Sequence, residues 1–67
     1  MMYPNLRAEM ARRSINNEVL SKVLQIDINT VSRKLNNPRL LKYYEAVLIK
    51  KTLFPELGLE YLFNTAE

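Results

Sequence analysis

The chain has 67 residues, 48% of them hydrophobic and 25% charged, and it contains neither cysteine nor histidine. This composition is typical of one small globular domain, and it excludes disulfides, Cys/His zinc sites and catalytic groups that use a histidine base. The net charge of +3 is unevenly distributed, because residues 1–42 carry eight Lys or Arg against three acids while residues 43–67 carry two against four. This pattern is typical either of an ordinary solvated surface or of a face that binds a polyanion.

Apolar residues recur at spacings of three and four along the chain, and strict alternation never lasts. The sequence therefore predicts an all-α domain of five short helices that spans residues 1–67 without a linker or repeat. The first helix is expected over residues 5–13, directly after Pro4. Leu6 and Met10 lie one turn apart and form its buried side.

A second helix is expected to begin at Asn16 or Asn17, whose side chains can accept backbone N–H bonds. It ends near residue 24, and its apolar stripe consists of Leu20, Val23 and Leu24. Asp27 is expected to cap a third helix over about residues 28–35. The Asn-Asn-Pro segment at 36–38 stops this helix after two turns, since proline disfavours helix in the residue before it.

A fourth helix is predicted over residues 42–53, ending before Pro55, and Gly58 permits a last helical turn over residues 59–63. The tyrosines and phenylalanines are expected in the core or at its rim, because they are not clustered with basic residues as a platform for single strands would be. The apolar positions of these two helices are Tyr43, Ala46, Val47, Ile49, Leu53, Leu62 and Phe63.

Residues 16–36 carry the informative pattern. Two short helices joined by a turn of three or four residues, with an apolar residue in the turn, are typical of a helix-turn-helix. The small Ser21 lets the two helices cross closely, Ile26 fills the corner, and Val31 anchors the second helix to the first. The sequence therefore predicts that the second of these helices presents an outward face to a partner.

That outward face carries residue types that read DNA. On a helical wheel, Asn29 and Arg33 stand together opposite Val31 and Leu35. Arginine can form two hydrogen bonds with guanine in the major groove, and asparagine can form two with adenine. We therefore expect Asn29 and Arg33 to contact bases.

The sequence resembles the phage repressor and Cro-type helix-turn-helix proteins, particularly their small Gram-positive versions. The resemblance spans nearly the whole chain and includes NLRAEMARR at 5–13, Leu20, Ile26, TVSRKLNNPR at 30–39, Glu45-Ala46 and FPELGLEYLF at 54–63. It implies a compact five-helix domain like that of lambda repressor. It further implies a transcriptional regulator that binds double-stranded operator DNA as a homodimer in the cytoplasm of a bacterial host, associated with the nucleoid.

The resemblance also implies which residues touch DNA. The base contacts would be Ile28, Asn29, Ser32 and Arg33, and the phosphate contacts would be Asn16, Asn17, Thr30, Lys34, Asn36, Arg39 and Lys42. Phosphate contacts position the protein without specifying a sequence. Ile28 has two interpretations, because its periodicity also allows it to be a core residue.

Two positions depart from the family pattern. Gln25 occupies a turn position that is usually glycine and often needs a positive φ, so either Gln25 accepts strain of about 1 kcal/mol or the turn is built differently. Ser21 replaces an alanine of nearly the same size.

Partners other than DNA are also considered. A weak homodimer would use exposed apolar groups such as Leu48, Phe54 and Leu57, and the alternative function is an antirepressor that binds a partner repressor. We expect no enzyme activity, no cofactor and no metal, since the carboxylates are scattered and no nucleophile has a base. The sequence also lacks an apolar stretch of transmembrane length, so no membrane association is expected.

Overall fold

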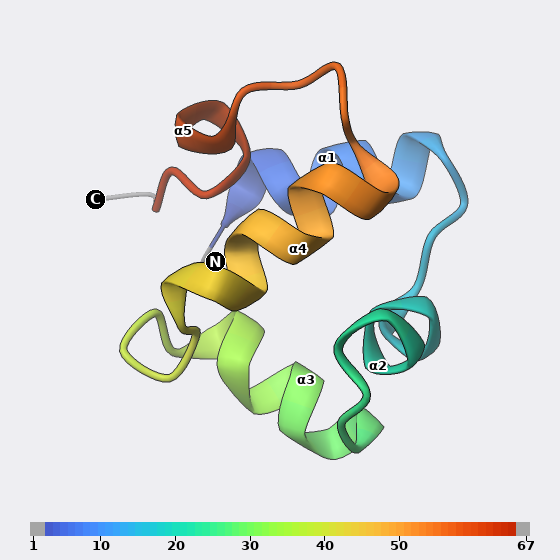
Figure 1. Cartoon of the computed structure of the whole chain (residues 1–67), viewed down its shortest axis with the longest axis vertical. Helices are drawn as coiled ribbons and strands as arrows, with labels where there is room; N and C mark the ends of the chain where they lie inside the picture. Colours follow the sequence, from blue (N-terminus) through green and yellow to red (C-terminus); the bar gives the residue numbers. More distant parts are fainter. Residues whose placement is uncertain (1–2, 66–67) are drawn as a thin grey trace.

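Five helices make up most of residues 3–65, the part of the chain that the computed structural model describes. They are α1 (Pro4–Arg12), α2 (Asn17–Leu24), α3 (Ile28–Asn36), α4 (Tyr43–Leu53) and α5 (Leu59–Leu62) (Figure 1). The prediction of an all-α, five-helix domain is confirmed, with helix ends that differ from the expected ones by about one residue. In this part of the chain, no helix has the length and apolar character needed to span a bilayer.

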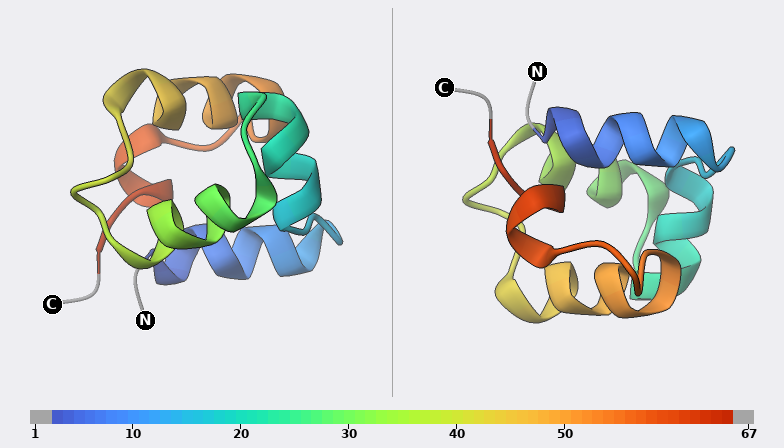
Figure 2. Two further views of the ribbon diagram at one scale, coloured as in Figure 1. Left: turned by 90° about the horizontal axis from the view of Figure 1, so that it is seen from below. Right: turned by 90° about the horizontal axis from the view of Figure 1, so that it is seen from above.

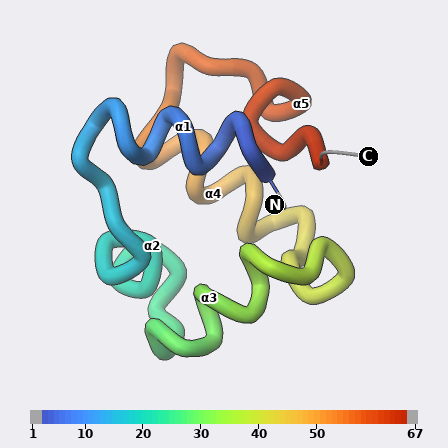
Figure 3. Tube along the Cα trace, turned by 180° about the vertical axis from the view of Figure 1, so that it is seen from behind, coloured from blue at the N-terminus to red at the C-terminus, as the bar shows by residue number. Residues whose placement is uncertain are grey.

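The helices are arranged around a common centre. α1 and α4 lie on opposite faces of the molecule, as Figures 2 and 3 show, and the other three helices connect these faces. α2 packs against α3 and α4, whereas α5 packs against α1 and α4. α3 thus lies at one side of the molecule and α5 at the other (Figure 1).

Every helix or its flanking residue contributes to the core. The fully buried side chains are Leu6, Leu20, Val31, Leu35, Ile49, Phe54 and Leu62. The predicted core positions on α1 and α3 are confirmed, and on α2 Leu20 is buried and Leu24 packs against the core, whereas Val23 is only half-buried. Leu62 and Phe63 close the core as expected, with the Phe63 ring 5.6 Å from that of Tyr3 in an edge-on contact. Burial of these apolar side chains is the main source of stability in so small a domain.

Phe54 does not lie on the surface that the dimer prediction requires. Its side chain is 0% exposed, because the chain turns at the end of α4 and directs the ring into the core. Leu57 packs partly buried against the same core. Of the three residues proposed for a dimer surface, only Leu48 is exposed.

Tyr43 and Tyr44 lie outside the core. They are 75% and 64% exposed, although the apolar spacing predicted that Tyr43 lies on the buried side of its helix. The reason is that the first turn of α4 buries Glu45 instead, which forms an ion pair with Lys34 of α3. A charged residue thus occupies the inward position that the pattern assigned to an aromatic one.

Candidate nucleic-acid interface

The turn between α2 and α3 consists of residues 25–27 and sets the direction of α3. Gln25 adopts the left-handed conformation with φ 58° and ψ 45°. The N–H groups of Gln25 and Ile26 both donate to the carbonyl oxygen of Ser21, the latter at 3.1 Å. The turn is therefore built as it would be with glycine, and Gln25 accepts the strain of a positive φ.

Both predicted caps of the helix-turn-helix are confirmed. The Asn16 side chain accepts the N–H of Val19 at 3.1 Å, and the Asp27 side chain accepts the N–H of Asn29 at 2.8 Å. These bonds satisfy backbone donors that the first turn of a helix leaves unpaired. They fix the start of both helices, and they also engage the Asn16 oxygen within the fold.

α3 has a buried apolar side and an exposed polar side, with Ile28 and Lys34 as exceptions. Val31 and Leu35 are buried, Ile26 packs against the core from the turn, and Asn29 and Arg33 are exposed on the opposite side. No other helix lies in front of α3 in the view from below (Figure 2). Thr30 and Ser32 are half-buried at the edges of this face.

Ile28 does not belong to the core. Its side chain is 44% exposed. It lines a shallow groove where the start of α3 meets residues of α1 and the first turn of α2, among them Asn17. The remaining interpretation of Ile28 is an apolar contact at the tip of α3, next to the outward face.

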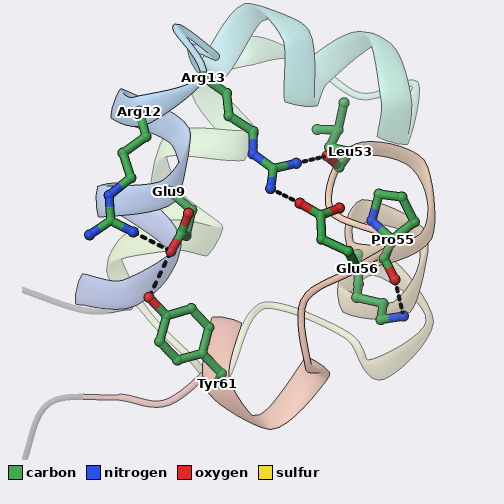
Figure 4. A network of polar contacts seen from close by, with 8 residues as sticks. Glu9, Arg12, Arg13, Leu53, Pro55, Glu56 and Tyr61 are labelled. Carbon is green, nitrogen blue, oxygen red and sulfur yellow. Dashed lines mark hydrogen bonds and ion pairs between the residues drawn. The ribbon is translucent and has the colours of Figure 1, made fainter.

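Several cations far from α3 in the fold are engaged by internal partners, as Figure 4 shows. Arg12 forms an ion pair with Glu9 at 2.7 Å. Arg13 pairs with Glu56, donates to the carbonyl oxygen of Leu53 at 2.9 Å and places its guanidinium 4.9 Å from the centre of the Phe54 ring. The Lys50 ammonium donates to the carbonyl oxygen of Pro55. Arg13 holds the ends of α1 and α4 together, whereas the Arg12 and Lys50 bonds lie within α1 and at the end of α4.

Besides Asn16, two more of the residues expected to contact phosphates have side-chain bonds inside the fold. The Lys34 ammonium lies 3.1 Å from the Glu45 carboxylate, and the Lys34 side chain is only 14% exposed. The Asn36 side chain accepts a hydrogen bond from Arg7 and donates one to the carbonyl oxygen of Ser32, both at 3.0 Å. Sequence reasoning could not foresee the bonds to Glu45 and Arg7, since these partners come from α4 and α1, whereas the bond to Ser32 lies within α3.

The cations that keep their charged groups without an internal partner are concentrated near α3. Within residues 3–65, the guanidinium and ammonium groups of Arg33, Arg39 and Lys42 form no hydrogen bond or ion pair, and all three side chains are exposed. Arg33 belongs to α3, and the other two lie in the loop of residues 37–42 that follows it. Lys51, on α4, is a further exposed cation whose ammonium group forms no hydrogen bond or ion pair within residues 3–65.

The opposite side of the molecule carries a polar network that the sequence did not reveal. The buried Glu9 carboxylate accepts the Tyr61 hydroxyl at 2.7 Å in addition to Arg12 (Figure 4). This hydrogen bond, together with partial desolvation and the Glu9 charge, raises the pKa of Tyr61 above its ordinary value. The network attaches α5 to α1.

Comparison of the chain with protein-family models, with curated proteins and with solved structures gives no match. The chemistry of the outward face of α3 and of the cations beside it is therefore the basis for a functional interpretation.

Proposed function

We propose that this protein binds double-stranded DNA in a sequence-dependent manner, with α3 in the major groove, and acts as a transcriptional regulator in the manner of a small repressor or Cro protein. The observation that carries the proposal is the outward face of α3. Asn29 and Arg33 are exposed one turn apart there, and neither side chain is bonded within residues 3–65. A short helix that packs one side into the core and leaves the other side exposed suits the width of the major groove.

The roles of the individual side chains follow from their chemistry. Arg33 would pair with guanine and Asn29 with adenine, each pair contributing about 1–3 kcal/mol of discrimination between bases. Ser32 can donate to or accept from a base, and Ile28 can contact a thymine methyl group from the tip of α3. These four residues form the base-reading set.

Phosphate contacts come from the surroundings of α3. Arg39 and Lys42 have unpaired cationic groups, and the first turn of α2, at Asn17, offers backbone N–H groups to a phosphate. Thr30 can contribute its hydroxyl from the edge of the face. Asn16, Lys34 and Asn36 are omitted from this set, because the side chains of all three are bonded within the fold.

An exposed apolar surface on α4 supports association with a second protein molecule. Tyr44 and Leu48 lie one turn apart and are 64% and 40% exposed. A homodimer formed there would present two copies of α3 to half-sites about one helical turn of DNA, ~34 Å, apart. The same surface also supports the alternative function, an antirepressor that binds a partner repressor.

The test is a selection from random-sequence duplexes, followed by binding measurements at several salt concentrations. The selection identifies the preferred site without knowledge of the operator. Arg33→Ala is expected to lose about 1–3 kcal/mol of discrimination at one base pair. Arg39→Ala is expected to weaken binding to all duplexes and to lower the salt-dependence slope by about 0.9.

Lys51→Ala is the matched control, because Lys51 is an exposed cation without an internal partner that lies on α4 and outside the proposed interface. It should leave the base preference unchanged. If no sequence is enriched at low salt, DNA reading by α3 is refuted, and affinity capture by a repressor becomes the experiment for the alternative.

A further inference from the structure

The loop of residues 37–42 is tied to the fold by one buried ion pair. The Lys34 ammonium, one turn before this loop, donates to the carbonyl oxygen of Leu40 at 3.0 Å and lies 3.1 Å from Glu45 Oε1. The same carboxylate oxygen accepts the backbone N–H of Lys42 at 3.0 Å. The buried Glu45 and the half-buried Lys34 thus hold the middle and the end of the loop.

The bonds of this pair point at the loop backbone rather than at solvent. The side chains of Lys34 and Glu45 are 14% and 5% exposed. A buried ion pair adds little to stability compared with an apolar pair of the same shape, since desolvation offsets the attraction. Directional bonds to a carbonyl and an N–H of the loop are what an apolar pair could not supply.

The loop bears two of the three unpartnered cations of the candidate interface. Arg39 directly precedes Leu40, the first tied point, and its own N–H donates to the Asn37 side chain at 3.1 Å. Lys42 ends the loop as the residue before α4. When a cation on a mobile loop binds a phosphate, the loop becomes ordered, and the lost conformational entropy weakens binding. A loop that is already held in place loses less entropy.

We propose that Lys34 and Glu45 are positioning residues for DNA binding, which hold the loop so that Arg39 and Lys42 meet the phosphates beside α3. The inference rests on the proposed function. It gives Lys34 an indirect role in place of a direct phosphate contact, and it makes an acidic residue necessary for binding a polyanion.

Glu45→Gln is the decisive variant, because electrostatics and positioning predict opposite results. Removing a negative charge should strengthen DNA binding if only charge matters. If Glu45 positions the loop, binding should weaken by about tenfold at 0.1 M salt for each phosphate that the loop no longer binds, and the salt slope should fall by up to about 1.8. Glu60→Gln, at an exposed position on α5, is the matched control for the charge change.

A second measurement needs no DNA. Trypsin cuts after Arg39 and after Lys42, and mass spectrometry identifies these cuts. In Glu45→Gln, cleavage in the loop should be several-fold faster than in the natural chain, while cleavage after Lys51, inside α4, stays slow. A uniform increase at all three positions would mean global unfolding.

The double variant Lys34→Met with Glu45→Leu guards against loss of the fold, because it replaces the pair by apolar side chains of similar volume. It too should show fast loop cleavage and a reduced salt slope. Unchanged loop cleavage in both variants, or tighter DNA binding by Glu45→Gln that equals the effect of Glu60→Gln, overturns the positioning role. Absence of specific binding by the natural chain overturns the proposed function, and the DNA role of the pair with it, whatever the cleavage pattern.

Discussion

Replacing Gln25 by glycine should make the protein more stable. Gln25 has a φ of 58°, and its side chain is exposed and forms no hydrogen bond in the described part of the chain. The left-handed conformation costs an L-residue about 1–2 kcal/mol. Glycine avoids this cost but loses about 0.5–1 kcal/mol more chain entropy on folding. The expected gain in unfolding free energy is the difference, about 0.5–1 kcal/mol.

Urea denaturation monitored by circular dichroism measures this gain, and thermal unfolding should show an increase in Tm of about 2–8 °C for a domain of this size. Gln25→Ala is the control, because alanine loses the same side chain but keeps the strain. It should stay within about 0.5 kcal/mol of the natural chain. A glycine variant no more stable than the alanine variant would refute a left-handed corner between α2 and α3.

Other variants probe the glycine, the core, the Glu9 network and the α4 surface. Gly58→Ala should raise the unfolding free energy by about 0.4–1 kcal/mol, because Gly58 has a φ of −74° and an added Cβ meets no atom within 4 Å. A loss of stability in urea denaturation would contradict this prediction. Phe54→Ala should lower it by about 3–5 kcal/mol, since the ring is fully buried, and a small loss in the same assay would place Phe54 at the surface. The raised pKa of Tyr61 means that the folded state holds the phenol proton more tightly than the unfolded state. The stability that this proton contributes to the folded state is fully present below pH 10 and is lost as the pH rises through the folded pKa. Stability measured between pH 8 and pH 12 should therefore fall less steeply in Tyr61→Phe, and identical profiles would exclude the bond to Glu9. Leu48→Glu should reduce self-association of the protein on an operator duplex, measured by sedimentation. Unchanged self-association would mean that the dimer contact lies elsewhere on the molecule.

Local patterns of the sequence were enough to predict the helices and most of the core. Asn16, Asp27 and the proline after α3 act on their nearest neighbours, so their effect on helix ends follows from the chain alone. The failures concern α4. The apolar spacing of α4 predicted that Tyr43 is buried, but Glu45 is buried instead, in an ion pair with Lys34 eleven positions earlier. Nothing in the local sequence distinguishes Glu45 from an ordinary surface acid.

Some features of the candidate interface could likewise be predicted from local sequence, and others could not. The sequence by itself determined which helix turns outward and that Asn29 and Arg33 share its outer face, because helical periodicity and the helix-turn-helix corner are local properties. It also raised the question of Gln25 without answering it. Only the tertiary structure decided that Gln25 accepts a positive φ, that Lys34 and Asn36 are bonded internally, and that Arg39 and Lys42 are not. The physical reason is that a polar side chain bonds to whatever the folded chain brings within about 3 Å of it, and the Glu45 partner of Lys34 and the Arg7 partner of Asn36 come from other helices.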